Sequence, residues 1–189
     1  LLAIDVPNNI RKTGQWLLKN NNTELTNQMA ASIMALYNIY LITNDSIYFD
    51  GAKEKLEKII SFQNSSGYYP EYGGYDIGYL SIQLSCLGKY YYKTNDAKLY
   101  NSALKAVKFG EQHINGNGLF EYNDSSRQTQ FLYPYGFFIF NSQVLDRIVN
   151  GLIQDVIINP FWMDDRYSIG MAIDYLETYL AIKNENDND

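Results

Sequence analysis

The chain has 189 residues, with 15 Lys and Arg against 21 Asp and Glu, so its formal net charge of −6 disfavours a surface for nucleic acids or anionic membranes. Its 46% hydrophobic and 19% charged residues are typical of a globular domain and exclude wholesale disorder. No run reaches the ~18 apolar residues of a membrane span, and the single cysteine, Cys86, allows neither an internal disulfide nor a zinc site.

Hydrophobic residues recur with helical spacing along nearly the whole chain. In one segment Ile77, Leu80, Leu84 and Leu87 fall on a single helix face, and Asp76 precedes them as an N-cap candidate. No segment alternates apolar and polar residues over the length of a strand, so the pattern predicts an all-α fold. We expect one domain over 1–183 and a polar, acidic tail over 184–189. The expected helices span 8–19, 24–43, 46–63, 77–93, 97–114, 136–157 and 168–183.

The chain partly matches itself when it is shifted by 51 residues. Each copy reads as a helix, a short Thr-Asn-Asp turn, a second helix, and a loop containing Gly, an aromatic residue and Glu-Tyr. Ile169-Gly170 echoes Ile77-Gly78, which indicates a weaker third copy from Ser168. Repeated helical hairpins of this length favour an incomplete α/α toroid over an open solenoid. The aligned pairs include Tyr40 with Tyr91, Thr43 with Thr94, Asn44 with Asn95, Asp45 with Asp96, Gly67 with Gly118, and Glu71 with Glu121.

The connections between successive hairpins are long and cover 64–76, 115–134 and 158–167. In stacked antiparallel hairpins every second connection lies at the same end, so we expect these three loops to gather on one face. Loops of this length are usually functional or disordered. Their Tyr, Gly and Phe content argues against disorder, and the sequence therefore predicts the functional site on this face.

Residues 67–81 read Gly-Tyr-Tyr-Pro-Glu-Tyr-Gly-Gly-x-Asp-Ile-Gly-Tyr-Leu-Ser, and 126–137 carry a second stretch rich in Tyr and Phe. These stretches resemble segments in the α/α toroids of heparinase-type polysaccharide lyases and related proteins of bacterial exopolysaccharide clusters. The resemblance covers about 24–140 and implies a toroid fold and a carbohydrate substrate. The chain is too short for a complete toroid, so we expect an incomplete one or a part of a longer one.

Loop 64–76 crowds acidic, phenolic and stacking groups into a few residues. Tyr68, Tyr69 and Tyr72 could stack on sugar rings, while Glu71 and Asp76 could form the acid/base pair of a glycoside hydrolase. Structural roles compete with this interpretation. Asp76 also fits the N-cap of the following helix, and Glu71 recurs in the repeat as a structural residue would.

Loop 115–134 supplies a second group of candidates. The guanidinium of Arg127 is a natural partner for the carboxylate of a uronic acid, with Glu121 and Tyr122 as further binding residues. Elimination also needs a base, and the resemblance to lyases implies Tyr133 or Tyr135 in that role. Alternatively, Arg127 ties this loop to a neighbouring carboxylate.

Three further side chains invite interpretation. Trp162 could stack a sugar ring on the expected loop face or cover the end of an unfinished barrel. His113, the only histidine, fits a packed or exposed residue at a helix end better than a base. Trp16 is expected in the core.

We therefore predict a carbohydrate-active domain that acts on or binds a polysaccharide or oligosaccharide as a lyase, glycosidase or epimerase. The alternative is a non-catalytic module that binds a glycan or a protein. No metal or other cofactor is expected, because ligand clusters and nucleotide motifs are missing from the sequence. The opening Leu1-Leu2-Ala3 suggests a fragment or mature form, which makes the remainder of a longer chain a further partner. The compartment stays open.

Overall fold

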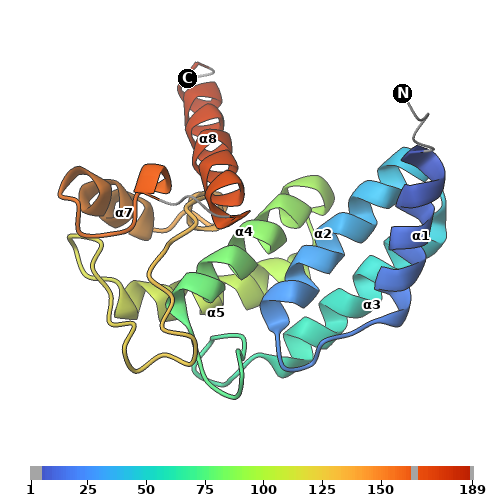
Figure 1. Ribbon diagram of the computed structural model, residues 1–189, viewed down its shortest axis with the longest axis horizontal. Coiled ribbons are helices and arrows are strands. Elements are labelled where there is room, and N and C mark those ends of the chain that lie inside the picture. The colour runs from blue at the N-terminus through green and yellow to red at the C-terminus, as the bar shows by residue number, and fades with distance from the viewer. Residues whose placement is uncertain (1–5, 163–165, 188–189) are drawn as a thin grey trace.

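The computed structural model describes residues 6–162 and 166–187. These residues form eight α-helices and one short 3-10 helix with no strand, which confirms the all-α prediction. None of the described helices is long and apolar enough to cross a membrane. The elements are α1 (Val6–Lys19), α2 (Thr26–Thr43), α3 (Ser46–Phe62), α4 (Ile77–Thr94), α5 (Ala97–His113), α6 (Tyr135–Ile139), α7 (Val144–Ile153), η1 (Pro160–Trp162) and α8 (Arg166–Asn186) (Figure 1).

The two Thr-Asn-Asp turns have the same geometry. Asn44 and Asn95 end α2 and α4 in the left-handed conformation, at φ 52° and 51°, and their N–H groups donate to carbonyls four residues earlier. Asp45 and Asp96 then cap α3 and α5 by accepting hydrogen bonds from backbone N–H groups in the first turn. Asn tolerates the left-handed region and Asp is a preferred N-cap, so the sequence repeat is also a structural one.

The hairpins α2–α3 and α4–α5 pack side by side, with α2 next to α4 in one layer and α3 next to α5 in the other. Helix α2 contacts α3 within its hairpin and α4 in the next, while α3 contacts α5 and α1 covers both α2 and α3 (Figure 1). The apolar stripes identified in the sequence meet in the core, where Ile33, Leu36, Leu80 and Leu84 are fully buried. Burial of each such side chain contributes about 1.5–3 kcal/mol.

The single helix expected over 136–157 is two helices. Helix α6 ends at Ile139, Asn141 adopts a left-handed φ of 51°, and α7 begins at Val144. The Ser142 hydroxyl accepts a hydrogen bond from the Val144 N–H at 3.2 Å. The apolar spacing continues across this break, which is why periodicity alone predicted one helix.

Helix α8 projects from the hairpins and contacts α6 and η1 (Figure 1). Asp174 and Glu177 on α8 also pair with Lys89 of α4. It buries Met171, Asp174 and Thr178 against the rest of the protein. The helix continues to Asn186 and so includes the first three residues of the expected tail, whose last two residues lie outside the described part.

Both tryptophans lie on the surface. Trp16 is 62% exposed, so its expected place in the core was wrong. Trp162 belongs to η1, which contacts α8 and lies away from loop 63–76 (Figure 1). The described part of the third long connection therefore lies away from loop 63–76, although its Ile158 packs against the cluster of Phe131, Tyr133 and Met171.

Candidate functional site

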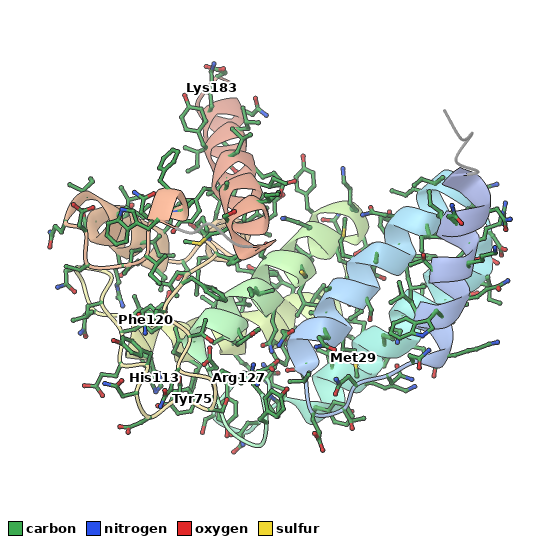
Figure 2. All side chains as sticks on the ribbon, viewed as in Figure 1. Met29, Tyr75, His113, Phe120, Arg127 and Lys183 are labelled. Atoms are coloured by element: carbon green, nitrogen blue, oxygen red, sulfur yellow. The ribbon has the colours of Figure 1, made fainter. Side chains whose placement is uncertain are left out.

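The two other long loops do meet, and we call residues 63–76 and 114–134 the loop face. The Ser126 N–H donates to the Tyr75 carbonyl at 2.9 Å, and Gly74 lies against Ser126. Figure 2 shows Tyr75, His113 and Arg127 at this same edge of the molecule. The expectation that these loops gather together is confirmed for two of the three.

Asp76 joins the two loops and caps α4. One carboxylate oxygen accepts from the Tyr79 N–H at 2.9 Å, which is the N-cap bond. The other accepts from the Ser125 hydroxyl and from the backbone N–H groups of Arg127 and Thr129, at 3.1–3.2 Å. With these partners and only 1% of its surface exposed, Asp76 has a complete structural role.

Glu71 is fully buried below the N-terminus of α2. Its Oε1 accepts from the Asn27 N–H and the Gln83 side-chain amide, each at 2.7 Å, and its Oε2 accepts from the Asn27 side-chain amide at 2.7 Å. The N-cap residue of α2, Leu25, has no side-chain acceptor. Glu71 supplies that acceptor from another part of the chain, and a negative charge there also suits the helix dipole.

Burial raises the pKa of the Glu71 carboxyl above its ordinary value of 4.5, although the hydrogen bonds it accepts act in the opposite direction. The folded chain therefore holds this proton to a higher pH than the unfolded chain. The resulting stability is fully present below about pH 4.5 and is lost as the pH rises through the raised pKa. We therefore expect the difference in free energy of unfolding between wild type and Glu71→Gln to decrease as the pH rises through the raised pKa. Urea unfolding of both proteins at a series of pH values measures this difference. An advantage that does not change with pH would contradict this assignment.

Aromatic packing accounts for much of the tyrosine content of the loop face. The Tyr69 hydroxyl is buried at 2.7 Å from the Ser102 hydroxyl. Tyr68 and Tyr75 pack on Phe109, and His113 stacks on the same ring at 4.1 Å between centroids. These rings hold the loop on α5, and His113 is a helix-end residue as predicted, packed where the sequence had left packing or exposure open.

The exposed part of the loop face carries an arginine between two tyrosines. The Arg127 guanidinium lies 4.5 Å from the ring centroid of Tyr72 and 5.8 Å from that of Tyr79, which is cation–π geometry. Glu121 is exposed nearby in sequence, and Tyr122 is half-buried with its ring against Phe120. Among the residues that the structure describes, Arg127 thus rests on aromatic rings and pairs with no carboxylate.

Tyr133 and Tyr135 are both largely buried, and their backbone N–H groups donate to Ser81 and Asp174. Burial raises the pKa of Tyr135, which makes it a poorer base near neutral pH. Its ring lies 5.3 Å from the Nζ of Lys89. Lys89 is ten residues, or about 15 Å, further along α4 than the Tyr79 that holds Arg127. The structure therefore does not bring Arg127 and Tyr135 together, and the Tyr133 ring packs on Phe131 at 5.8 Å between centroids.

A buried charge cluster that the sequence analysis missed anchors α8. Asp174 is fully buried, accepts from the Ser85 hydroxyl and the Tyr135 N–H, and lies 3.1 Å from the Nζ of Lys89. The same Nζ pairs with Glu177 at 2.6 Å. Burial raises the pKa of Asp174, while Lys89 lowers it.

Beside this cluster an open groove of about 1120 Å³ runs between α4 and α8. We call it the α4–α8 groove. It is bounded by the C-terminal halves of both helices, by α6, and by the start of α7. Its lining includes aromatic rings, side-chain amides, lysines, glutamates and aliphatic groups, among them Tyr91, Tyr92, Tyr135, Phe138, Asn95, Asn141, Lys89, Lys93, Glu177, Glu185 and Leu180.

Of the residues predicted from sequence, only Tyr135 lines this groove. The sequence signal that could have found the groove is the run Lys89-Tyr90-Tyr91-Tyr92-Lys93, which places aromatic and basic groups on successive faces of one helix.

The described residues bring together no group of three or more His, Cys, Asp or Glu side chains that could hold a metal ion. Comparison with protein-family models, curated proteins and solved structures finds no match to this chain.

Proposed function

We propose that this protein is a non-catalytic helical-repeat module that binds a neutral polysaccharide chain in the α4–α8 groove. The composition of the groove is the observation that supports this proposal. Its open surface combines aromatic rings, including Tyr92, which is 62% exposed, with the side-chain amides of Asn95 and Asn141. Aromatic faces cover the C–H surface of sugar rings, and amides both donate to and accept from hydroxyl groups.

The charges of the groove favour a neutral ligand. Lys89 and Lys93 are matched in number by Glu177 and Glu185. Lys89 is held by Asp174 and Glu177, so its charge is already compensated. A uronic acid polymer would therefore find little net attraction in a groove whose lysines and glutamates are equal in number, which favours a neutral chain.

The same contacts favour binding over catalysis. Glycoside hydrolysis uses two carboxyl groups that flank the scissile bond. Glu71 and Asp76 are enclosed by hydrogen-bond donors, and Glu177 of the groove is ion-paired with Lys89. This arrangement supports the module interpretation over the lyase or glycosidase one.

We also infer that the hairpins α2–α3 and α4–α5 are an arc of an incomplete α/α toroid. The two first helices, α2 and α4, contact each other, as do the two second helices, α3 and α5. This layering, with the resemblance of 67–81 to toroid segments, supports the inference.

Calorimetric titration with neutral hexasaccharides such as cellohexaose, xylohexaose and mannohexaose tests the binding proposal. We expect one of them to bind and Tyr92→Ala to weaken it by about tenfold or more, because the exposed ring supplies the stacking surface. Tyr72→Ala is the matched control, since Tyr72 is a 49% exposed tyrosine of the loop face.

The opposite pattern, with binding lost in Tyr72→Ala and kept in Tyr92→Ala, would move the site to the loop face and contradict the proposal. Release of new reducing ends or unsaturated products from any of these sugars, or from oligogalacturonate, would show that the protein is an enzyme.

A further inference from the structure

Helix α8 is apolar on two opposite sides. One side packs into the protein through Met171, where Asp174 and Thr178 also lie. The opposite side presents a row that we call the α8 stripe, formed by Ile169, Ile173, Leu176 and Leu180, which are 46–68% exposed. Their spacing of four, three and four residues is that of a coiled-coil seam. A helix that is apolar on both sides is normally covered on both sides.

The equivalent helices in the hairpins are covered in that way. Helix α4 lies between α2 on one side and α6 on the other and also contacts α5, whereas the described elements cover only one side of α8. The sequence echo between Ile77-Gly78 and Ile169-Gly170 sharpens this contrast, because Ile77 is buried and Ile169 is exposed. The α8 stripe has the residues of a helix–helix interface without the second helix.

The stripe is complementary to itself. When two copies of α8 run antiparallel about a two-fold axis between Ile173 and Leu176, Ile169 meets Leu180 of the partner subunit. Ile173 then meets Leu176 of the partner subunit. All four positions are thus matched apolar to apolar, which is what a two-fold interface between identical surfaces requires, and the two helix dipoles oppose each other favourably.

The exposed apolar area around the α8 stripe is also large enough for a dimer interface. Tyr179 on α8, and Phe161 and Trp162 on η1, are 57–95% exposed, and η1 contacts α8. Aromatic side chains bury about 150–250 Å² each when covered, so these three rings offer roughly 450 Å² per copy. The four aliphatic side chains of the stripe bring the total near the ~800 Å² per partner of a standard protein interface.

We propose that this protein forms a two-fold dimer through an antiparallel pairing of its α8 stripes. Leu180 lies where the α8 stripe borders the α4–α8 groove, so the pairing would cover that edge of the groove. The walls made by Lys89, Tyr92 and Asn141 would stay uncovered, and the pairing does not depend on what the groove binds.

Sedimentation equilibrium over the micromolar range tests this proposal. We expect the wild-type chain to sediment at twice its 21.8 kDa mass. Ile173→Glu with Leu176→Glu should raise the dissociation constant at least about a hundredfold, because each change would bury a carboxylate against apolar groups. Ile42→Glu is the matched control, since Ile42 is an isoleucine of similar exposure at the far end of α2. A wild-type monomer throughout, or an unchanged dimer in the double variant, would overturn the proposal.

Oxidative cross-linking tests the direction of the pairing. A chain carrying Ile173→Cys mixed with one carrying Leu176→Cys should give a disulfide-linked heterodimer in excess over both homodimers. The wild-type chain, whose only cysteine is Cys86 on α4, controls for its contribution. Preferential linking of each variant to itself would indicate parallel helices and contradict the antiparallel dimer.

Discussion

Replacement of Glu71 by alanine should lower the free energy of unfolding by about 3–5 kcal/mol. The change removes the acceptor for the Asn27 N–H at the start of α2 and leaves the amides of Asn27 and Gln83 without their partner. It also opens a cavity in a fully buried position. Urea denaturation followed by circular dichroism measures the loss.

Glu71→Gln is the informative control. A glutamine keeps one acceptor oxygen for the Asn27 N–H and Gln83, and the Asn27 side-chain amide can turn its oxygen toward the new N–H₂ group. We therefore expect Glu71→Gln to cost less than about 1.5 kcal/mol at neutral pH. If Glu71→Ala and Glu71→Gln both kept wild-type stability, the structural role of Glu71 would be refuted.

Asp174→Ala should produce the second largest effect, a loss of about 3 kcal/mol that is concentrated in α8. The change leaves the Ser85 hydroxyl and the Tyr135 N–H without their acceptor and removes one partner of Lys89. Since this cluster anchors α8 to α4, the helix should detach before the hairpins unfold. Hydrogen exchange should then be fast along α8 and unchanged in α2 and α4.

Glu177→Ala provides the comparison within the same cluster. Glu177 binds the same Lys89 Nζ, but its side chain is half-exposed, whereas that of Asp174 is fully buried. Exposed ion pairs contribute about 0–1 kcal/mol, so this variant should keep α8 protected. Equal destabilisation by the two changes would mean that burial of Asp174 is not what anchors the helix.

The elements that sequence predicted best are those with local signals. The Thr-Asn-Asp turns place Asn in a left-handed C-cap and Asp in the following N-cap, and both preferences act within four residues. The apolar stripe on α4 likewise predicted its buried face. Such features depend on the chain nearby and little on tertiary packing.

The site depends on contacts that no local pattern reports. Lys89 and Asp174 are far apart in sequence, and α8 brings them together. Glu71 and Glu121 occupy matching repeat positions, yet only Glu71 lies under a helix N-terminus and is buried there. The loop composition therefore drew attention to residues that hold the fold, while the groove formed between helices distant in the chain.

The central claim is that a neutral sugar chain occupies the α4–α8 groove. Chemical-shift mapping of ¹⁵N-labelled protein with the hexasaccharide that binds in the calorimetric screen tests it most directly. We predict the largest changes at the amides of Tyr91, Tyr92 and Asn141, with loop residues 68–76 unchanged. Changes confined to 68–76 and 121–133, with the groove amides silent, would contradict the account and place the ligand on the loop face.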